Sequence, residues 1–271
     1  MKIVVWLIVF SLLFIGFFHP VYSITQDLGR HLKTGEIILQ THSVPKTNLF
    51  SYTHPNFPFI NHHWLSEVIY YISFQKIGFN GLLIINTVLA LLSFGLIFLK
   101  ASKKSKAIVL LFCSLLYVPI LFERTDVRPE FFSFLFLSVF IIILYKFREK
   151  FTRLIFLLPL VELLWVNTHI YFPIGIVLIV FFAIDSIVKH KSLNSRYIGI
   201  FVVVFAGCIL ATFLNPNGLK GALYPLSVFQ NYGYSIEENQ NIFFLWNFVH
   251  KQSILFFFIA TPILFIVLIS N

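Results

Sequence analysis

A short stretch near residue 30 carries polar side chains at the spacing of one helical turn. Asp27, Arg30, His31 and Thr34 lie three or four residues apart and would share one helix face. His31 could orient the Asp27 carboxylate or share a divalent metal with it, but two ligands are too few to predict a metal site. The guanidinium group of Arg30 could bind a phosphate group. Both residues can also be explained without a ligand. Asp27 would then be an acid that the helix dipole favours in a first helical turn, and Arg30 would reach lipid headgroups.

A second polar group begins at His62. His63 precedes Glu67 by four residues, so the histidine would hold the glutamate on one face of a helix. We expect this pair to form one wall of a binding pocket. A helix start at the membrane interface, where Trp64 is at home, explains the same residues without a ligand.

Three further residues complete the expected site. Arg128 belongs to the run 123–130, which holds three acids and two arginines, and it is the preferred phosphate contact; ion pairing within the run is the alternative. His169 ends an apolar stretch, where helix capping or packing is the alternative role. Glu237 lies among aromatic residues, a combination that suits a sugar but also a solvated loop.

The composition determines which kind of fold must position these residues. Of 271 residues, 58% are hydrophobic and 11% are charged, whereas soluble domains carry about 25% charged residues. These proportions exclude a soluble globular chain and a disordered one. In a membrane protein basic residues set the orientation in the bilayer, so the net charge of +9 is explained by orientation rather than by nucleic-acid binding. Cys113 and Cys208 lie in apolar runs and predict no disulfide framework.

Continuous apolar runs without period-two alternation predict helices rather than the strands of a barrel. We therefore expect an all-α polytopic membrane protein with residues 1–271 in a single transmembrane domain. The expected eight spans cover about 3–23, 80–99, 107–122, 131–145, 154–171, 173–188, 197–214 and 253–270. Glu162 falls within one span, where an acid must face the bundle interior, be protonated or pair.

The basic residues indicate the orientation of these spans. Twelve of the 20 Lys and Arg residues are Lys2 and members of the loops 100–106, 146–153 and 189–196. This bias places both termini in the cytoplasm of a multi-pass cell-membrane protein. Most acids and histidines fall on the other side, so we expect the chemistry to be extracytoplasmic.

The outer loop 24–79 is expected to contain two interfacial amphipathic helices. The first covers about 26–40, and its apolar face carries Leu28, Leu32 and Leu39. Prolines predict an extended loop at 43–60. Asn61 is the expected N-cap of a second helix at about 62–76, whose apolar side carries Leu65, Val68, Ile69 and Ile72. A second large outer loop is expected at 215–252.

Several motifs occur in an order that resembles a known family. They lie at 27–36, 44–45, 50–53, 63–67, 128–130, 165–169, 214–218, 224–225 and 236–238. Together they resemble the GT-C superfamily of polyprenyl-phosphate-sugar-dependent membrane glycosyltransferases, in particular a broad bacterial group. The resemblance covers nearly the whole chain and rests on the order and placement of the motifs.

The resemblance implies inverting transfer of a sugar from a polyprenyl-phosphate donor to a lipid, glycan or protein acceptor in the cell envelope. In this family an acid just after the first span accepts the acceptor's proton, which implies Asp27 as the general base. The substrate-binding residues are expected to be Arg30, His31, His63, Glu67, Arg128, His169 and Glu237. GT-C proteins are often longer, so the resemblance also implies that a chain ending at Asn271 is a fragment or a minimal version.

Two other functions stay open. A transporter or flippase of lipid-linked saccharides would use Glu162 to line a path, and glycosyl transfer would not depend on Asp27. A non-catalytic membrane scaffold would tolerate replacement of the outer polar residues. The sequence contains no P-loop, dinucleotide-binding fingerprint or nucleophile elbow.

Overall fold

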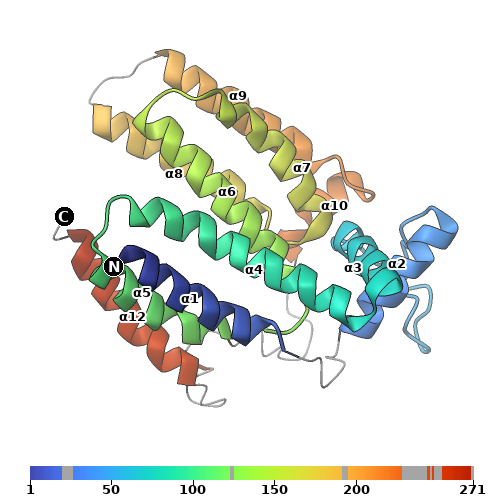
Figure 1. The fold of residues 1–271 in the computed structure, drawn as a ribbon. Helices are drawn as coiled ribbons and strands as arrows, with labels where there is room; N and C mark the ends of the chain where they lie inside the picture. Colours follow the sequence, from blue (N-terminus) through green and yellow to red (C-terminus); the bar gives the residue numbers. More distant parts are fainter. Residues whose placement is uncertain are drawn as a thin grey trace. The chain divides into compact units, whose positions relative to one another are not determined.

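The computed structural model describes residues 1–19, 27–122, 125–190, 195–227, 243–244, 246 and 252–269, and this part of the chain is all-helical (Figure 1). The elements are α1 (Lys2–Phe17), α2 (Leu28–Thr41), α3 (Trp64–Ile77), α4 (Phe79–Ser102), α5 (Ala107–Phe122), α6 (Glu130–Glu149), the short 3-10 helix η1 (Arg153–Leu157), α7 (Leu158–Thr168), α8 (Pro173–His190), α9 (Ser195–Thr212), α10 (Gly218–Ser227) and α12 (Gln252–Ile269). The described residues contain no β-strand, and an isolated antiparallel bridge joins Thr47 to Pro58. The expected all-α class is confirmed for these residues.

Each expected span coincides with helical structure, but the helices differ in length. In the described part of the chain, α4 and α6 are long and apolar enough to cross a membrane. The shorter apolar helices are Lys2–Phe17, Ala107–Phe122, Pro173–Val188, Arg196–Thr212 and Ile254–Ile263. By length and composition, α4 and α6 are therefore the candidate membrane spans among the described residues.

The contacts divide the chain into two compact units. The first unit comprises 1–19, 98–126 and 229–271. Its described helices α1 and α12 both pack against α5. Gly16 lets α1 approach α5 closely, because a side chain there would overlap the ring of Phe122. These contacts join segments far apart in sequence, so hydropathy alone could not reveal them.

The second unit comprises 20–97 and 127–228 and contains a helix bundle. In this bundle α6 packs against α7 and α8, and α9 packs against the same two helices (Figure 1). The largest fully buried side chains of its core include Phe140, Leu144, Phe147, Ile155 and Trp165. The bundle is the framework against which the polar residues of the second unit are placed.

Helices α2 and α3 pack along one another, and α3 also contacts α7. Their ends lie within two residues of the expected boundaries. Gly35 allows the close approach, because a Cβ there would overlap the carbonyl oxygen of Glu67. Four polar side chains of these helices are buried, namely His31, Thr34, Ser66 and Glu67, whereas others such as Lys33, Gln40 and Lys76 are exposed. The apolar residues singled out above, Leu28 excepted, are half-buried.

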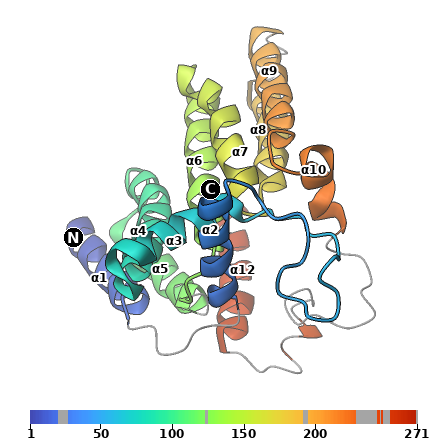
Figure 2. The same cartoon turned by 90° about the vertical axis from the view of Figure 1, so that its right-hand side faces the viewer.

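Two local expectations need correction. His63, rather than Asn61, is the N-cap residue of α3; the Asn61 side-chain oxygen accepts a hydrogen bond from the backbone N–H of His63 at 2.9 Å, just before the helix begins. The segment 215–252, expected as a loop, contains α10 close to its start (Figure 2). The Asn215 side chain builds the turn before α10 by donating to the carbonyl oxygens of Thr212 and Gly218 at 2.7 and 2.9 Å.

Candidate functional site

Glu67 is fully buried. It lies at the centre of a polar cluster formed by Asp27, Arg30, His31, Asn61, His63, Glu67 and His169. The Nδ1 atom of His31 lies 2.9 Å from Glu67 Oε1, and the Asn61 amide donates to Oε2 at 2.6 Å. The Nη1 atom of Arg30 lies 3.7 Å from Oε1. A buried carboxylate is tolerated only where charges and hydrogen bonds replace its hydration, and these three side chains supply both.

Arg30 also contacts Asp27, the residue expected to be the general base. Asp27 is the N-cap residue of α2, and its Oδ1 atom lies 3.4 Å from Arg30 Nη2. The Asp27 side chain is 46% exposed and the Arg30 side chain 30% exposed. One guanidinium therefore links a half-exposed carboxylate with the buried carboxylate of Glu67.

These contacts correct two expected pairings. His31 contacts Glu67 rather than orienting Asp27, and Arg30 takes the place beside Asp27. The side chain of Glu67 is held by His31 rather than by His63, whose Nδ1 atom has no hydrogen-bond partner in the described structure. Helices α2 and α3 pack closely at Gly35, where a Cβ would overlap the Glu67 carbonyl oxygen, and this approach brings Glu67 within reach of His31.

Four imidazoles gather beside this pair of carboxylates and form the histidine cluster, His31, His62, His63 and His169. The ring centre of His63 lies 5.3 Å from that of His31, 3.9 Å from that of His62 and 5.2 Å from that of His169. Burial, with a smaller contribution from the nearby Arg30 charge, lowers the pKa of His62 to about 4. Burial also holds the pKa of His63 well below its ordinary range. Both rings are therefore neutral at pH 7.

The histidine cluster does not form a metal site. The described residues contain no group of three or more His, Cys, Asp or Glu side chains that could hold a metal ion. The rings of His63 and His169 stack with an interplanar angle of 27°, so they meet face to face rather than by converging nitrogens. The residues present thus do not fit the divalent metal that the sequence left as an alternative.

The end of α7 fixes the histidine cluster to the helix bundle. His169 Nδ1 lies 2.7 Å from Ser133 Oγ, and the same hydroxyl accepts a hydrogen bond from the Trp165 indole at 2.7 Å. All three side chains are buried. This network spans α6 and α7 and holds the imidazole that stacks on His63.

The first turn of α3 is attached to the same end of α7. The Trp64 indole donates to Asn167 Oδ1 at 2.6 Å, and the Ser66 hydroxyl donates to the carbonyl oxygen of Thr168 at 2.9 Å. Asn167 also donates to the carbonyl oxygen of Leu214 at 3.0 Å, just before the turn that leads into α10. The motif at 165–169 therefore joins three segments that are distant in sequence.

Two of the expected site residues make none of the contacts given above. The Nη1 atom of Arg128 lies 3.9 Å from Glu130 Oε1, which is the ion pairing weighed as the alternative, and the Arg128 carbonyl oxygen accepts a hydrogen bond from Tyr70. Glu237 lies outside the described residues. The contacts above link the other expected residues: Asp27, Arg30, His31, His63, Glu67 and His169.

Sequence reasoning missed four side chains that support the cluster. Asn61 was assigned to a helix cap, yet it donates to Glu67. Ser133, Trp165 and Asn167 were not expected to position other side chains. A signal was present for Ser133 and Asn167, because polar residues inside apolar runs must find buried partners.

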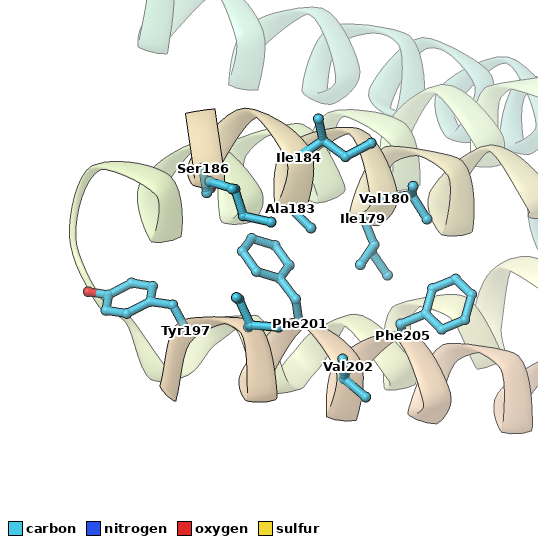
Figure 3. A pocket seen from close by; sticks show the side chains of 11 residues that line it. Ile179, Val180, Ala183, Ile184, Ser186, Tyr197, Phe201, Val202 and Phe205 are labelled. Atoms are coloured by element: carbon cyan, nitrogen blue, oxygen red, sulfur yellow. The ribbon is translucent and has the colours of Figure 1, made fainter. Parts of the chain in front are cut away.

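The described structure also contains cavities in the second unit. An apolar cavity of about 500 Å³ lies between α8 and α9, lined by residues such as Ile179, Ala183, Phe201 and Phe205 (Figure 3). It includes none of the expected site residues. An open pocket of about 430 Å³ lies beside Trp64, Asn167 and Asn215, next to the attachment of α3 to α7. This second pocket adjoins the polar cluster. The side-chain amides of Asn167 and Asn215, which line it, already make hydrogen bonds within the protein.

Comparison of the chain with protein-family models, curated proteins and solved structures found no match. The assignment of a function therefore rests on the sequence resemblance and on the geometry of the polar cluster.

Proposed function

We propose that this chain is an integral membrane glycosyltransferase of the GT-C type, with Asp27 as its general base. The observation that carries the proposal is the Asp27–Arg30–Glu67 chain of contacts. It holds a half-exposed carboxylate, the form that a proton acceptor needs, at the start of a helix fixed to its neighbour by buried polar contacts. The motifs at 27–36, 63–67 and 165–169, which carry the resemblance, supply most residues of the cluster.

The proposed topology places this cluster at the extracytoplasmic face of the membrane. Eight spans with both termini in the cytoplasm put α2, α3 and the end of α7 on the same outer side. The hydrogen bonds from α3 to Asn167 and Thr168 support this arrangement, because they require the start of α3 and the end of α7 to lie at the same level. A polyprenyl phosphate has its phosphate at such a boundary.

The proposed reaction inverts the anomeric carbon of the donor sugar. The bond from this carbon to the phosphate oxygen breaks, and its electron pair leaves with the polyprenyl phosphate. A new bond forms to the acceptor oxygen or nitrogen, whose proton passes to Asp27. Cationic groups near the phosphate stabilise the charge that grows there, and Arg30 is the cation placed closest to Asp27 in the described structure.

The test uses the purified protein in lipid nanodiscs with a panel of polyprenyl-phosphate sugars and extracytoplasmic acceptors. We expect the protein to consume a donor and Asp27→Asn to lose this activity. Glu36→Gln is the matched control, because Glu36 lies on α2 but pairs with Lys33 at the surface. Equal turnover by Asp27→Asn and the unmodified protein would remove Asp27 from the mechanism.

One observation favours a second function, the transport or flipping of a lipid-linked saccharide. Both carboxyl oxygens of Glu162 are buried in the bundle without a hydrogen-bond partner among the described residues. Acids at such positions often serve transport paths. Movement of a fluorescent lipid-linked sugar across proteoliposomes, abolished by Glu162→Gln and retained by Asp27→Asn, would support transport over transfer.

A further inference from the structure

Arg30 lies between two carboxylates whose surroundings differ strongly. Its Nη1 atom lies 3.7 Å from Glu67, and its Nη2 atom lies 3.4 Å from Asp27. Glu67 is fully buried, whereas the Asp27 side chain is 46% exposed. The same guanidinium is therefore attached to the protein interior on one side and faces the surface on the other.

The two contacts should respond differently to a ligand. Glu67 cannot turn away from Arg30 without leaving His31 and Asn61, which hold its two oxygens at 2.9 and 2.6 Å. Asp27 has no second side-chain partner in the described structure, and exposed ion pairs contribute little because water competes for both charges. The contact to Asp27 is the exchangeable one.

We infer that Arg30 is a phosphate-binding residue that exchanges Asp27 for an oxygen of a lipid-linked phosphate while it stays anchored on Glu67. The identity of the ligand rests on the proposed glycosyl transfer. The exchange leaves Asp27 without its ion pair, ready to accept a proton. Donor binding thus precedes the action of the base, and Glu67 and His31 act as positioning residues for Arg30.

The chemistry of the guanidinium fits this exchange. Arginine presents five N–H donors in a planar fork that matches phosphate oxygens, so it can hold the phosphate and Glu67 with different edges. The negative charge of Glu67 opposes an incoming anion less than its formal value suggests, because His31 and Asn61 also contact its two oxygens and replace water there. The charge of Asp27, by contrast, competes directly with the phosphate for Arg30.

This competition gives a gain-of-binding test. Binding of a polyprenyl monophosphate, which has no sugar to transfer, is measured on the whole protein in nanodiscs. Asp27→Asn removes the competitor, so we expect about two- to fivefold tighter binding, the change that corresponds to one exposed ion pair. Arg30→Gln should weaken binding about tenfold or more. Lys33→Gln is the matched control, because Lys33 is an exposed cation on the same helix that pairs with Glu36. This variant should bind the polyprenyl monophosphate as tightly as the unmodified protein.

The positioning role of Glu67 needs its own readout. Glu67→Gln keeps the shape of the side chain and an acceptor for His31 but removes the charge that anchors Arg30. We expect it to weaken phosphate binding both alone and together with Asp27→Asn, while thermal unfolding shows that the variants are folded. If Glu67→Gln left binding unchanged in the Asp27→Asn protein, Glu67 would have no positioning role.

Two ligand controls identify the source of the phosphate. Neutral polyprenol should bind without any effect of Arg30→Gln, because it lacks the anion. Inorganic phosphate at the concentration of the lipid should not displace the polyprenyl monophosphate; if it does, the site belongs to free phosphate and the lipid assignment is wrong. Binding to Asp27→Asn that is no tighter than to the unmodified protein overturns the exchange.

Failure of this inference can be told apart from failure of the proposed function. If the protein consumes a polyprenyl-phosphate sugar but Asp27→Asn does not bind the monophosphate more tightly, glycosyl transfer stands and the exchange falls. If the binding pattern is as expected but no donor is consumed, Arg30 is a lipid-phosphate site in a protein with another activity.

Discussion

His31 Nδ1 lies 2.9 Å from Glu67 Oε1, and this buried contact joins α2 to α3 across 36 residues of sequence. It connects the half-exposed end of the polar cluster, where Asp27 lies, to the histidine cluster in the interior. Removing His31 takes one hydrogen-bond partner away from a fully buried carboxylate, which costs more than the loss of an exposed contact would.

The first prediction concerns this contact. We expect His31→Ala to lower the free energy of unfolding by about 1–3 kcal/mol, because Glu67 keeps its burial and loses a hydrogen bond. Reversible unfolding in mixed micelles provides the measurement. Lys33→Ala removes an exposed ion pair on the same helix and should cost much less, because water screens exposed charges. Equal losses for the two variants would contradict a structural role for the buried contact.

Much of the helical framework could be predicted from the sequence. Apolar runs located the helices of both units, and turn residues bounded α2 and α3 to within two residues. Asp27, Arg30, His31 and Glu67 were singled out by their chemistry and spacing, and the structure brings them together. These successes depend on short-range patterns, which a single sequence contains.

The partners within the cluster could not be predicted in the same way. His63 lies one helical turn before Glu67, so spacing favours that pair, yet His31 on another helix makes the contact. The choice depends on the approach of two helices at Gly35, a tertiary feature. The roles of Ser133 and Trp165 likewise depend on where α6 and α7 meet.

The second prediction concerns pH. Because burial lowers the pKa of His62 from 6.5 to about 4, the unfolded chain binds more protons than the folded chain between these values. Stability is therefore fully present above about pH 6.5 and falls as the pH decreases toward about 4. His63, whose pKa is also lowered, acts in the same direction. Melting temperature measured across this range should fall less steeply for His62→Gln than for the unmodified protein; identical slopes would show that His62 does not titrate in this way.

The third prediction concerns the close approach of α2 and α3. Gly35→Ala places a methyl group against the Glu67 carbonyl oxygen, so the helices must move apart and the His31–Glu67 contact must lengthen. We expect a loss of about 1–3 kcal/mol in stability, as for other overpacked sites. Gly199→Ala is the matched control, because a Cβ there meets no atom within 4 Å, and a helical alanine should be neutral or slightly stabilising. Thermal unfolding of both variants tests the difference, and a Gly35→Ala protein as stable as the control would contradict the observed packing.

The fourth prediction concerns Glu162 and its neighbour on α8. A Cβ at Gly175 would lie 2.6 Å from Glu162 Oε2 and 3.0 Å from the Phe140 ring, so the carboxyl group occupies the space that the glycine leaves. Gly175→Ala should therefore destabilise the bundle by about 1–3 kcal/mol. Glu162→Ala removes the group that the new methyl meets, and the double variant should lose less stability than the sum of the two single variants. A double-mutant cycle on unfolding free energies measures this coupling. Strictly additive losses would mean that the two residues do not share this space, and that the carboxyl group of Glu162 turns elsewhere in the bundle.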